Sequence, residues 1–543
     1  MTEQATSTEV LIVGAGPVGM VLACELLQQG IDIRIVDAEN RERFVDPHSR
    51  GILVWPRSVE ILRRIDVADR LVRLGHQSPS VHYYSERKLR GSARLDRHPD
   101  SPYPFVLTLP QRDTERVLRE RVAELGGTIE HEVHLVDLDN SGERPVATLR
   151  RADGTTELVT AEYLVGADGP ASTVRTLLNI RFDGDPIDVS YAIGDAPVTG
   201  DVPAEAQYYY CRTGVVALVP LRNGHYRIAA NIPHRGEDEP NPPAELLEQI
   251  IKERAGRDVK VGEPDWTRSF RPRLGLAEKY RAGRCLLAGD AAHVISPAGG
   301  QGMNVGLQDA VNLGWKLGGV LRNRLDESIM DTYEPERAVA AERMSRTSAA
   351  QARFALQRST WRIIRRDAIF LSAKALGVLQ RVLVPLLSQT DVHYGDSDST
   401  PIMLRGRGDR LEPGRRVPLF AGPPLADGTP SLDLYRYTIA CWPGRRAPRG
   451  WAEVVSAHRK AAGDDAAVLD LSTLTGPAAT KLRRAFGSKP AIAIVRPDGH
   501  LAELTTDLTG AAARAYLTGQ APAPTATPSP APEKTTRTTV PVP

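Results

Sequence analysis

Three glycines near the N-terminus, spaced as Gly14-x-Gly16-x-x-Gly19, are the first residues whose pattern indicates ligand binding. In this spacing the first glycine makes a tight turn, the second lets the main chain approach a pyrophosphate, and the third lets a helix pack closely on a strand. The phosphates would lie at the amino end of the helix that begins near Pro17. A second predicted strand, in which apolar and charged residues alternate, leads to Asp37, whose carboxylate can accept hydrogen bonds from ribose hydroxyls. The pattern predicts an adenine dinucleotide site and leaves NAD and FAD open.

Two later apolar runs also end in an aspartate beside a glycine, at Asp168-Gly169 and at Gly289-Asp290. Ligands of open parallel sheets bind at the carboxyl ends of the strands, so each aspartate could meet one part of a buried ligand. Each could equally be a helix cap or a turn former. The first motif is followed by Arg175. The two motifs add candidate polar groups to the site predicted from the glycines.

Strands and helices of a particular order are needed to position these motifs. Residues 10–13 form an all-apolar run, as expected of a central parallel strand that is covered on both faces. An apolar helix would follow the glycines and end near Gly30, and a second strand would run from Ile31 to Val36. This order predicts an α/β fold whose first domain is of the Rossmann type.

Taken together, these segments resemble the single-component FAD-dependent aromatic hydroxylases, the family of para-hydroxybenzoate, phenol, polyketide and rifamycin hydroxylases. The resemblance runs from Val10 to about Arg346. It includes a loop, residues 297–304, close to the family's flavin-facing loop, in which Ser296 precedes Pro297 where many relatives have two prolines. Three smaller segments also match, namely Arg50, residues 55–60 and residues 109–111.

The resemblance implies FAD as the bound cofactor and assigns a role to each matching residue. Asp37 would hold the adenosine ribose, and Asp290 would hold the ribityl chain. Arg50 and Gln111 would lie along the flavin and its pyrophosphate. Asp168 and Arg175 would contact FAD and also guide NADPH to it. The other residues expected to bind the cofactor are Gly14, Gly16, Pro17, Gly19, Gly289, Pro297, Gly300, Gly302, Met303 and Asn304. The expected catalytic positions, which would flank flavin C4a, are Pro297, Gly299 and Gly300.

The glycine-rich loop also has a physical interpretation of its own. It leads into a helix predicted from Val305 to about Leu321, whose amino end carries unpaired N–H groups and a partial positive charge. Reduced flavin is anionic around N1 and the C2 carbonyl. The helix start is therefore a fitting electrostatic partner for it.

Two motifs that other flavoenzymes carry are missing from the sequence, and their absence disfavours two classes of flavin chemistry. There is no second Gly-x-Gly-x-x-Gly unit with a Cys pair, as in disulfide reductases, and no Trp-x-Trp stretch, as in flavin halogenases. The resemblance then implies monooxygenation, in which transiently bound NAD(P)H reduces FAD, O2 adds at flavin C4a and the hydroperoxide transfers oxygen to an electron-rich phenolic or polycyclic ring. The protein would position the substrate and exclude water. A Baeyer–Villiger or epoxidising enzyme remains an alternative, and a flavin-binding protein without turnover is a more remote one.

The middle of the chain, roughly residues 185–271, changes to a strand pattern that predicts an antiparallel sheet covering the substrate. Residues 81–107 are expected to join this sheet. Half of the side chains on such strands point away from a bound ligand, so surface or core roles compete with substrate contact. The candidate substrate residues are Tyr83, Tyr208, Tyr210, Arg212, His225 and Tyr226.

The chain is expected to divide into five parts. A C-terminal domain that resembles the thioredoxin-like domain of phenol and polyketide hydroxylases is predicted without redox activity, because Cys441 stands alone. The Pro-, Ala- and Thr-rich tail is predicted to be disordered. The parts are an FAD-binding domain (1–80, 108–184 and 272–346), the substrate sheet (81–107 and 185–271), a helical connection (347–389), the C-terminal domain (390–519) and the tail (520–543).

Net charge and cysteine positions indicate which partners and which location to expect. With 69 basic and 67 acidic side chains the net charge is +2, which favours neither a nucleic acid nor a membrane as partner. The expected partner is a small aromatic molecule, and a homodimer is left open. The four cysteines lie far apart, so we expect packed thiols, a cytoplasmic location and no metal site.

Overall fold

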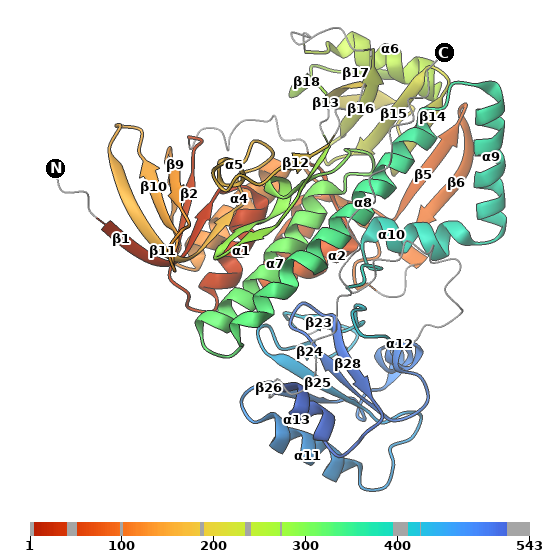
Figure 1. Ribbon diagram of the computed structural model, residues 1–543. Helices are drawn as coiled ribbons and strands as arrows, with labels where there is room; N and C mark the ends of the chain where they lie inside the picture. The colour runs from red at the N-terminus through yellow and green to blue at the C-terminus, as the bar shows by residue number, and fades with distance from the viewer. Residues whose placement is uncertain are drawn as a thin grey trace, which may run out of the picture.

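The computed structural model of the chain shows a central α/β body with a second sheet on one side and a smaller C-terminal unit on the other (Figure 1). The predicted cofactor residue Arg50 and the predicted tail lie outside the described residues. The structure describes residues 5–40, 51–97, 101–184, 189–233, 241–271, 274–394, 411–423 and 425–517.

The central sheet is mostly parallel, and its order places the predicted motifs at one edge. β1 pairs in parallel with β2 and with β11, so that Val13 lies between Val36 and Gly166 at the carboxyl ends of these strands. Residues 10–12 are fully buried, as their apolar character predicts. In spatial order the strands are β20 (Arg281–Ala282), β21 (Cys285–Leu287), β11 (Thr156–Gly166), β1 (Ala5–Val13), β2 (Ile33–Asp37) and β8 (Ile129–His131), with β10 (Val146–Arg150) and β9 (His134–Asp139) branching from β11.

Helices cover this sheet, and two of them begin at the edge where the motifs lie. α1 (Pro17–Leu27) follows the first glycines, and α7 (Gly302–Leu321) follows the second glycine-rich loop. α7 begins at Gly302, earlier than the predicted Val305, because the glycine-rich loop itself provides its first turn. The other helices of this body are α2 (Pro56–Arg64), α3 (Ala68–Leu74), α4 (Gln111–Glu124), α5 (Thr173–Leu177) and α8 (Tyr333–Ala355).

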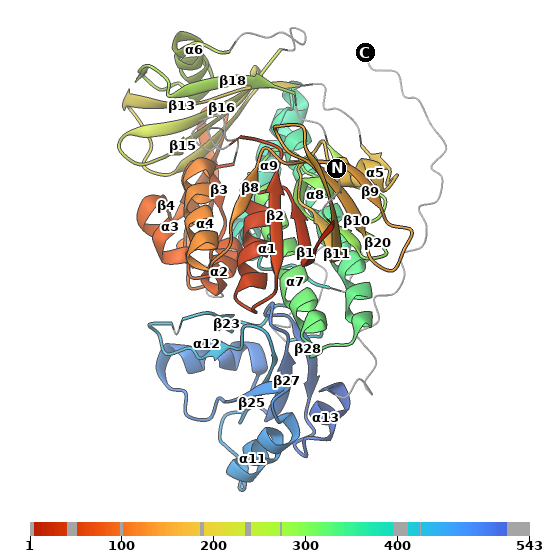
Figure 2. The same cartoon turned by 90° about the vertical axis from the view of Figure 1, so that its left-hand side faces the viewer.

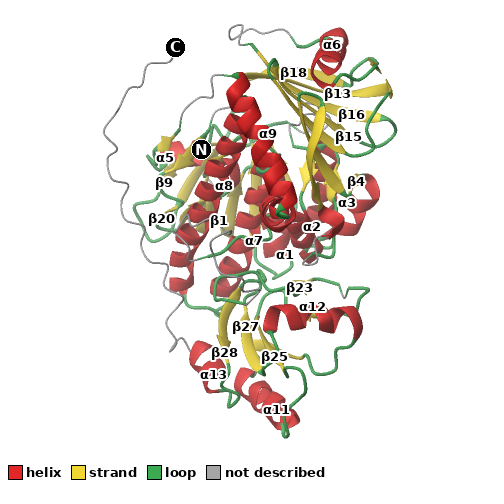
Figure 3. Ribbon diagram, turned by 90° about the vertical axis from the view of Figure 1, so that its right-hand side faces the viewer, coloured by secondary structure: helices red, strands yellow, loops and turns green. Residues whose placement is uncertain are grey.

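The second sheet is mainly antiparallel and includes a hairpin from an earlier part of the chain. β5 pairs in parallel with β14, with Tyr83 opposite Tyr208. α6 (Ala244–Ala255) covers the outer face of this sheet (Figure 3). In spatial order the strands are β17 (Val259–Val261), β13 (Ser190–Gly200), β16 (His225–Ile232), β15 (Gly214–Pro220), β14 (Ala206–Cys211), β5 (Ser80–Ser85) and β6 (Lys88–Arg94), and β18 (Trp266–Phe270) also pairs with β13.

Short strands form three small sheets that connect these parts. The segment 81–107 is predicted to join the second sheet, but its last two residues, 106 and 107, pair instead within the first of these small sheets. The small sheets are β3 (Leu53–Val54), β7 (Val106–Thr108) and β4 (His76–Ser78); β12 (Phe182–Asp183), β19 (Gly275–Ala277) and β22 (His293–Val294); and β23 (Phe420–Ala421) and β24 (Ser431–Leu432).

The C-terminal unit has its own four-stranded sheet, which lies against the far end of α7 (Figures 1 and 2). β25 and β26 are parallel, whereas β27 and β28 run antiparallel to their neighbours. In spatial order the strands are β26 (Ala466–Asp470), β25 (Tyr437–Trp442), β27 (Ala491–Val495) and β28 (Leu501–Thr505), accompanied by α11 (Trp451–Ala462), α12 (Gly476–Phe486) and α13 (Ala511–Leu517).

The connection between the body and this unit is helical. It comprises α9 (Thr360–Ala375), a π-helical turn (Leu379–Leu383) and α10 (Val384–Ser388), and it packs on the β5–β6 hairpin. Within the described part of the chain, no single helix is both long and apolar enough to span a membrane; α9 and the segment Leu379–Ser388 meet that test jointly, with a bend of 87° between them.

Candidate active site

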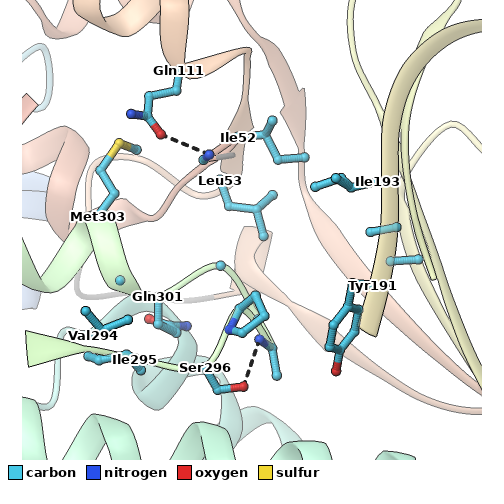
Figure 4. Close-up of a pocket in the computed structure, with 18 of the residues that line it drawn as sticks. Ile52, Leu53, Gln111, Tyr191, Ile193, Val294, Ile295, Ser296, Gln301 and Met303 are labelled. Carbon is cyan, nitrogen blue, oxygen red and sulfur yellow. Dashed lines mark hydrogen bonds between the residues drawn. The ribbon is translucent and has the colours of Figure 1, made fainter. Parts of the chain in front are cut away.

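A cavity of about 600 Å³ lies between the motif-bearing edge of the central sheet and the inner face of the second sheet. Figure 4 shows the loop with Ser296 and Gln301 on one side and Tyr191 and Ile193 of the second sheet on the other. The carboxyl end of α8, from Gln351 to Leu356, closes a further side. The predicted site residues that line the cavity are Gly16, Pro17, Tyr83, Gln111, Tyr208, Tyr210, Asp290, Pro297, Gly299, Gly300, Gly302 and Met303.

Glycine is needed at the first three glycine positions for different purposes, two for the fold and one for the cavity. A Cβ on Gly14, which has φ +105°, would lie 2.3 Å from the carbonyl oxygen of Ala167, and a Cβ on Gly19 would lie 2.0 Å from the carbonyl oxygen of Gly14. Both are therefore required by the fold. A Cβ on Gly16 would meet nothing within 4 Å, and Gly16 lines the cavity at the amino end of α1, which has no side-chain cap. This arrangement fits a pyrophosphate at the helix start.

Asp37 lies beside the same turn. Its Oδ2 accepts a hydrogen bond from the Ala15 N–H at 2.6 Å, and its Oδ1 accepts from the Glu39 N–H at 2.9 Å. The Asp37 residue is only 8% exposed. Main-chain N–H groups thus hold the carboxylate at the end of β2. Asp37 does not line the cavity, and its contact with a ribose stays a prediction.

Asp168 and Arg175 make contacts within the protein and do not line the cavity. The Asp168 carboxylate accepts from the Ser172 hydroxyl at 2.6 Å and from the Thr173 N–H at 2.7 Å, so it caps α5. Arg175 donates to the carbonyl oxygens of Ala291 and Pro170, both at 2.8 Å. Arg175 therefore ties the loop after β11 to the turn after β21, and the neighbouring Gly169 and Pro170 reach the cavity instead.

The Gly289-Asp290 turn is anchored by a buried carboxylate on α7. Oδ2 of Asp309 accepts from the Gly289 N–H at 3.0 Å and pairs with His293 Nε2 at 2.6 Å, while Oδ1 accepts from Arg337 Nε at 2.6 Å. Burial alone would raise the pKa of Asp309, but His293 and Arg337 hold that pKa below its ordinary value. The ionised Asp309 fixes a turn that presents Asp290 to the cavity.

The loop at residues 297–301 is pinned to a segment of the chain far away in sequence. Asn304 accepts from the Trp55 N–H and donates to the carbonyl oxygens of Leu53 and Gly300, each at 2.9 Å. Trp55 Nε1 donates to the Gly299 carbonyl at 3.1 Å. Asn304 thus shapes the predicted flavin-facing loop without lining the cavity itself.

The amino end of α7 opens into the cavity beside this loop. Gln301 at its N-cap position provides no side-chain cap, and a Cβ on Gly302 would meet nothing within 4 Å. Near Met303 of the same helix, Gln111 Oε1 accepts from the Gly51 N–H at 2.9 Å (Figure 4). Two helix starts with positive partial charge, at α1 and α7, therefore face one space, and the donors and the room fit an FAD molecule.

The second sheet contributes a wall of aromatic side chains. Tyr83 stacks on Tyr208 with ring centroids 5.7 Å apart and lies 6.1 Å from Tyr210, and Phe370 of α9 packs behind Tyr83 at 6.0 Å. Burial raises the pKa of Tyr208 to about 12 and raises that of Tyr83 and Tyr210 as well. The hydroxyls stay protonated near neutral pH and can donate hydrogen bonds to a ligand.

Three predicted substrate residues do not reach the cavity. Tyr226 donates to the Pro203 carbonyl at 2.8 Å and packs in the outer cluster under α6. Arg212 lies in the turn after β14 and donates to the Thr360 hydroxyl, and His225 is at the end of β16, 3.5 Å from Asp265. Tyr226 faces away from the cavity because adjacent side chains of a pleated strand point to opposite faces of the sheet.

Sequence reasoning also missed residues that do line the cavity. Arg227, next to Tyr226 on β16, faces inward, is paired with Asp195 and lies 4.9 Å from the ring centroid of Trp266. Tyr191 and Phe270 are partners across β13 and β18, with ring centroids 5.9 Å apart. The alternation along β16 could have indicated Arg227, but only after the register of the sheet was known.

Comparison with known proteins agrees with this geometry. A model of the FAD binding domain family matches residues 7–348. The chain is 35% identical to 6-methylpretetramide 4-monooxygenase of Streptomyces rimosus, with 96% of each chain covered. It is 32% identical to an uncharacterized aromatic compound monooxygenase of Bacillus subtilis, with 91% of this chain and 93% of that one covered. The solved structure of OxyS anhydrotetracycline hydroxylase from Streptomyces rimosus matches with a TM-score of 0.71 at 28% identity, covering 94% of this chain and 98% of that one.

These matches span the glycine motifs, the aspartate motifs and both walls of the cavity. The chain therefore belongs to the single-component FAD-dependent aromatic hydroxylases, monooxygenases that use FAD, NAD(P)H and O2 to hydroxylate an aromatic ring.

Proposed function

We propose that this monooxygenase hydroxylates a polycyclic aromatic compound that carries hydroxyl or carbonyl groups, of the polyketide type. One observation carries the proposal: a single cavity of about 600 Å³ has the glycine-rich loop on one side and three tyrosines on the other. Stacked aromatic rings favour a flat ligand, and tyrosine hydroxyls favour one with oxygen acceptors. The names of the two Streptomyces rimosus relatives, which refer to pretetramide and anhydrotetracycline, favour the same class.

The cofactor is proposed to lie along the edge of the central sheet. Its pyrophosphate would lie at Gly16 and the start of α1, its ribose at Asp37, its ribityl chain at Asp290 and its ring against Pro297 and the glycines that follow. FAD reduced by NAD(P)H would activate O2, of which one atom would go to the substrate ring and the other to water. The amino end of α7, with its partial positive charge, would stabilise negative charge on the ring.

The chain's own residues would orient the substrate and exclude water. Tyr83, Tyr208 and Tyr210 would stack on the ring and hydrogen-bond to its oxygen atoms. Ile52, Leu53, Ile193 and Phe270 add apolar surface to the cavity wall. An apolar wall on both sides of the reacting carbon keeps water from competing with the substrate.

A substrate screen tests this proposal. Phenols and polycyclic aromatic polyketides would be compared for stimulated NADPH consumption, with products analysed by mass spectrometry after reaction under oxygen-18. We expect a polycyclic compound to stimulate consumption and to gain one labelled hydroxyl. A strong preference for simple phenols would contradict the polycyclic proposal, and a labelled ester would indicate the Baeyer–Villiger alternative.

We further propose that residues 390–519, of which the structure describes 390–394, 411–423 and 425–517, form a thioredoxin-like unit without redox chemistry. The strand order β26-β25-β27-β28, with a parallel first pair and an antiparallel second pair, supports this assignment. Burial raises the pKa of Cys441 to about 12, so its thiol does not ionise near neutral pH. All four cysteines are buried free thiols, which favours the reducing cytoplasm as the location.

A further inference from the structure

A cluster of buried charged side chains joins the C-terminal unit to the flavin-binding body. The turn between β27 and β28 carries Arg496 and Asp498, both about 5% exposed or less. Arg496 donates to the two carboxylate oxygens of Glu336 on α8 at 2.6 and 2.9 Å, and to Asp498 Oδ2 at 2.7 Å. Since buried charges are stable only when paired, these contacts fix how the turn sits on the body.

The same cluster holds the distant half of α7. Asn312 and Lys316 both donate to Glu336 Oε2, at 2.7 and 2.8 Å. Both lie in the carboxyl-terminal half of α7, and the amino end of the same helix opens into the cavity. A helix is stiff along its axis, so fixing one end orients the other.

A second path leads from the C-terminal unit to the Gly289-Asp290 turn. The ring of His500 stacks on that of Tyr394 with centroids 4.0 Å apart. The Tyr394 hydroxyl accepts from Arg337 at 3.3 Å, Arg337 donates to Asp309, and Asp309 accepts from the Gly289 N–H. An unbroken series of buried contacts thus connects His500 with the turn that presents Asp290.

The turn between β27 and β28 also reaches α1. The Pro497 carbonyl accepts from Arg64 at 2.6 Å, and Arg64 donates to both carboxylate oxygens of Glu25 at 2.7 and 2.8 Å. Glu25 lies on α1 and is fully buried. Both helices whose amino ends face the cavity are therefore held by one turn of the C-terminal unit.

From these contacts we infer that the C-terminal unit positions the FAD site, with Arg496 and Tyr394 as positioning residues that set FAD affinity from outside the cavity. The inference rests on the proposed placement of FAD at Gly16 and Asp290. Neither positioning residue lines the cavity, so their loss would remove no group from its walls but would free α7 and the Gly289 turn to shift.

The test measures the FAD dissociation constant of the full-length apoprotein by fluorescence titration. Replacing Arg496 by Met should raise this constant about tenfold, because α7 would lose charged hydrogen bonds that hold it in place and would have to be ordered again when FAD binds. Tyr394→Phe removes only the hydroxyl and should raise it about threefold, so it decides the question if Arg496→Met does not fold. Asp470→Asn is the matched control, since Asp470 accepts from Trp451 and Ser472 within the C-terminal unit, and we expect its FAD constant to stay within about twofold of wild type.

Two further readouts separate positioning from general loosening of the structure. A double-mutant cycle compares the losses of FAD affinity in Tyr394→Phe, in Asp309→Asn and in the double variant. Because the two residues act along one path, the double variant should lose little more affinity than Asp309→Asn alone. Hydrogen exchange at the Gly289 turn should rise in Tyr394→Phe, which breaks the path to that turn, and stay unchanged in Asp470→Asn.

Asp290→Ala serves as the reference that tests the FAD placement itself. If Asp290→Ala weakens FAD binding while folded Arg496→Met and Tyr394→Phe bind FAD like wild type, the positioning inference is overturned and the placement stands. Unchanged FAD binding in Asp290→Ala would overturn the placement and the inference with it. Additive losses in the double-mutant cycle would also overturn the inference.

Discussion

The two walls of the cavity are built from different parts of the polypeptide. The wall proposed to face FAD is built largely of main chain, with glycines at 16, 299, 300 and 302 and two uncapped helix starts, and Asp290 adds a charged side chain to it. The opposite wall consists of side chains, chiefly Tyr83, Tyr208 and Tyr210. A main-chain wall recognises a ligand through N–H groups and the space that glycine leaves, whereas a side-chain wall recognises it by shape and hydroxyl position. Substitutions should therefore be tolerated far less on the first wall than on the second.

The largest effect is expected from Gly14→Ala, which should destabilise the folded protein itself. The new Cβ would lie 2.3 Å from a main-chain oxygen at a residue with φ +105°. Overpacking and backbone strain together should lower the free energy of unfolding by roughly 2–6 kcal/mol. Thermal unfolding of the apoprotein would measure the loss.

Gly16→Ala is the informative partner of that variant. Its Cβ would meet nothing in the protein, so the melting temperature of the apoprotein should not change, while a methyl group would fill the space proposed for the pyrophosphate. We expect FAD affinity to fall by about 1–3 kcal/mol, the usual cost of overpacking. A variant that binds FAD as tightly as wild type would show that this wall does not hold the cofactor.

A comparable loss of FAD affinity is expected from Asp290→Ala, which removes a polar group from the cavity but leaves the main chain in place. The lost hydrogen bond from a ribityl hydroxyl to a charged acceptor should cost about 1.5–3 kcal/mol of FAD affinity. Asp290→Asn, which keeps an acceptor oxygen, should lose less. Equal losses in both variants would contradict a role for the charge.

On the tyrosine wall, Tyr208→Phe should change substrate binding and leave FAD binding intact. Losing one hydroxyl donor should raise KM by a few-fold, for a cost of about 0.5–1.5 kcal/mol. Tyr226→Phe is the control, because the Tyr226 hydroxyl bonds to Pro203 on the outer face. An equal change of KM in both variants would argue against the proposed substrate wall.

A separate effect concerns how the stability of the C-terminal unit depends on pH. Burial lowers the pKa of His500 to about 4 from 6.5, although Asp498 lies 3.2 Å away and favours the charged form. Between these values the unfolded chain binds a proton that the folded protein does not, so stability is full above pH 6.5 and falls as the pH drops toward 4. His500→Phe, which keeps the ring stacked on Tyr394, should flatten this decline in melting temperature. An identical decline in both proteins would exclude His500 as its source.

At still lower pH, acid should also remove the stability that comes from ionised Glu336. Burial raises the pKa of Glu336, but Arg496 and Lys316 outweigh burial and lower it from 4.5 to about 2. The stability that Glu336 gains from Arg496 and Lys316 is therefore present above pH 4.5 and lost as the pH falls toward 2.

The main-chain wall could be predicted from the sequence, and the reason is physical. A turn with positive φ or a close main-chain contact leaves glycine as the residue that fits, so Gly14 and Gly19 mark the fold in the sequence itself. The same holds for the loop with Gly299 and Gly300, whose φ angles are +80° and +60°.

The side-chain wall could be predicted only in part. Tyr83, Tyr208 and Tyr210 line the cavity, but Tyr226 faces outward and its neighbour Arg227 faces inward. A shift of one residue in register exchanges the two faces of a strand, and the sequence does not determine that register. The contact of Arg496 with Glu336, 160 residues away, likewise depends on how separately folded parts meet.

The most direct test of the two-wall account is a crystal structure of the FAD-loaded protein with an aromatic ligand. The account predicts the pyrophosphate at Gly16, the flavin ring against residues 297–300, and the ligand between that ring and Tyr83, Tyr208 and Tyr210. A flavin ring bound elsewhere, or a ligand that makes no contact with the three tyrosines, would contradict it.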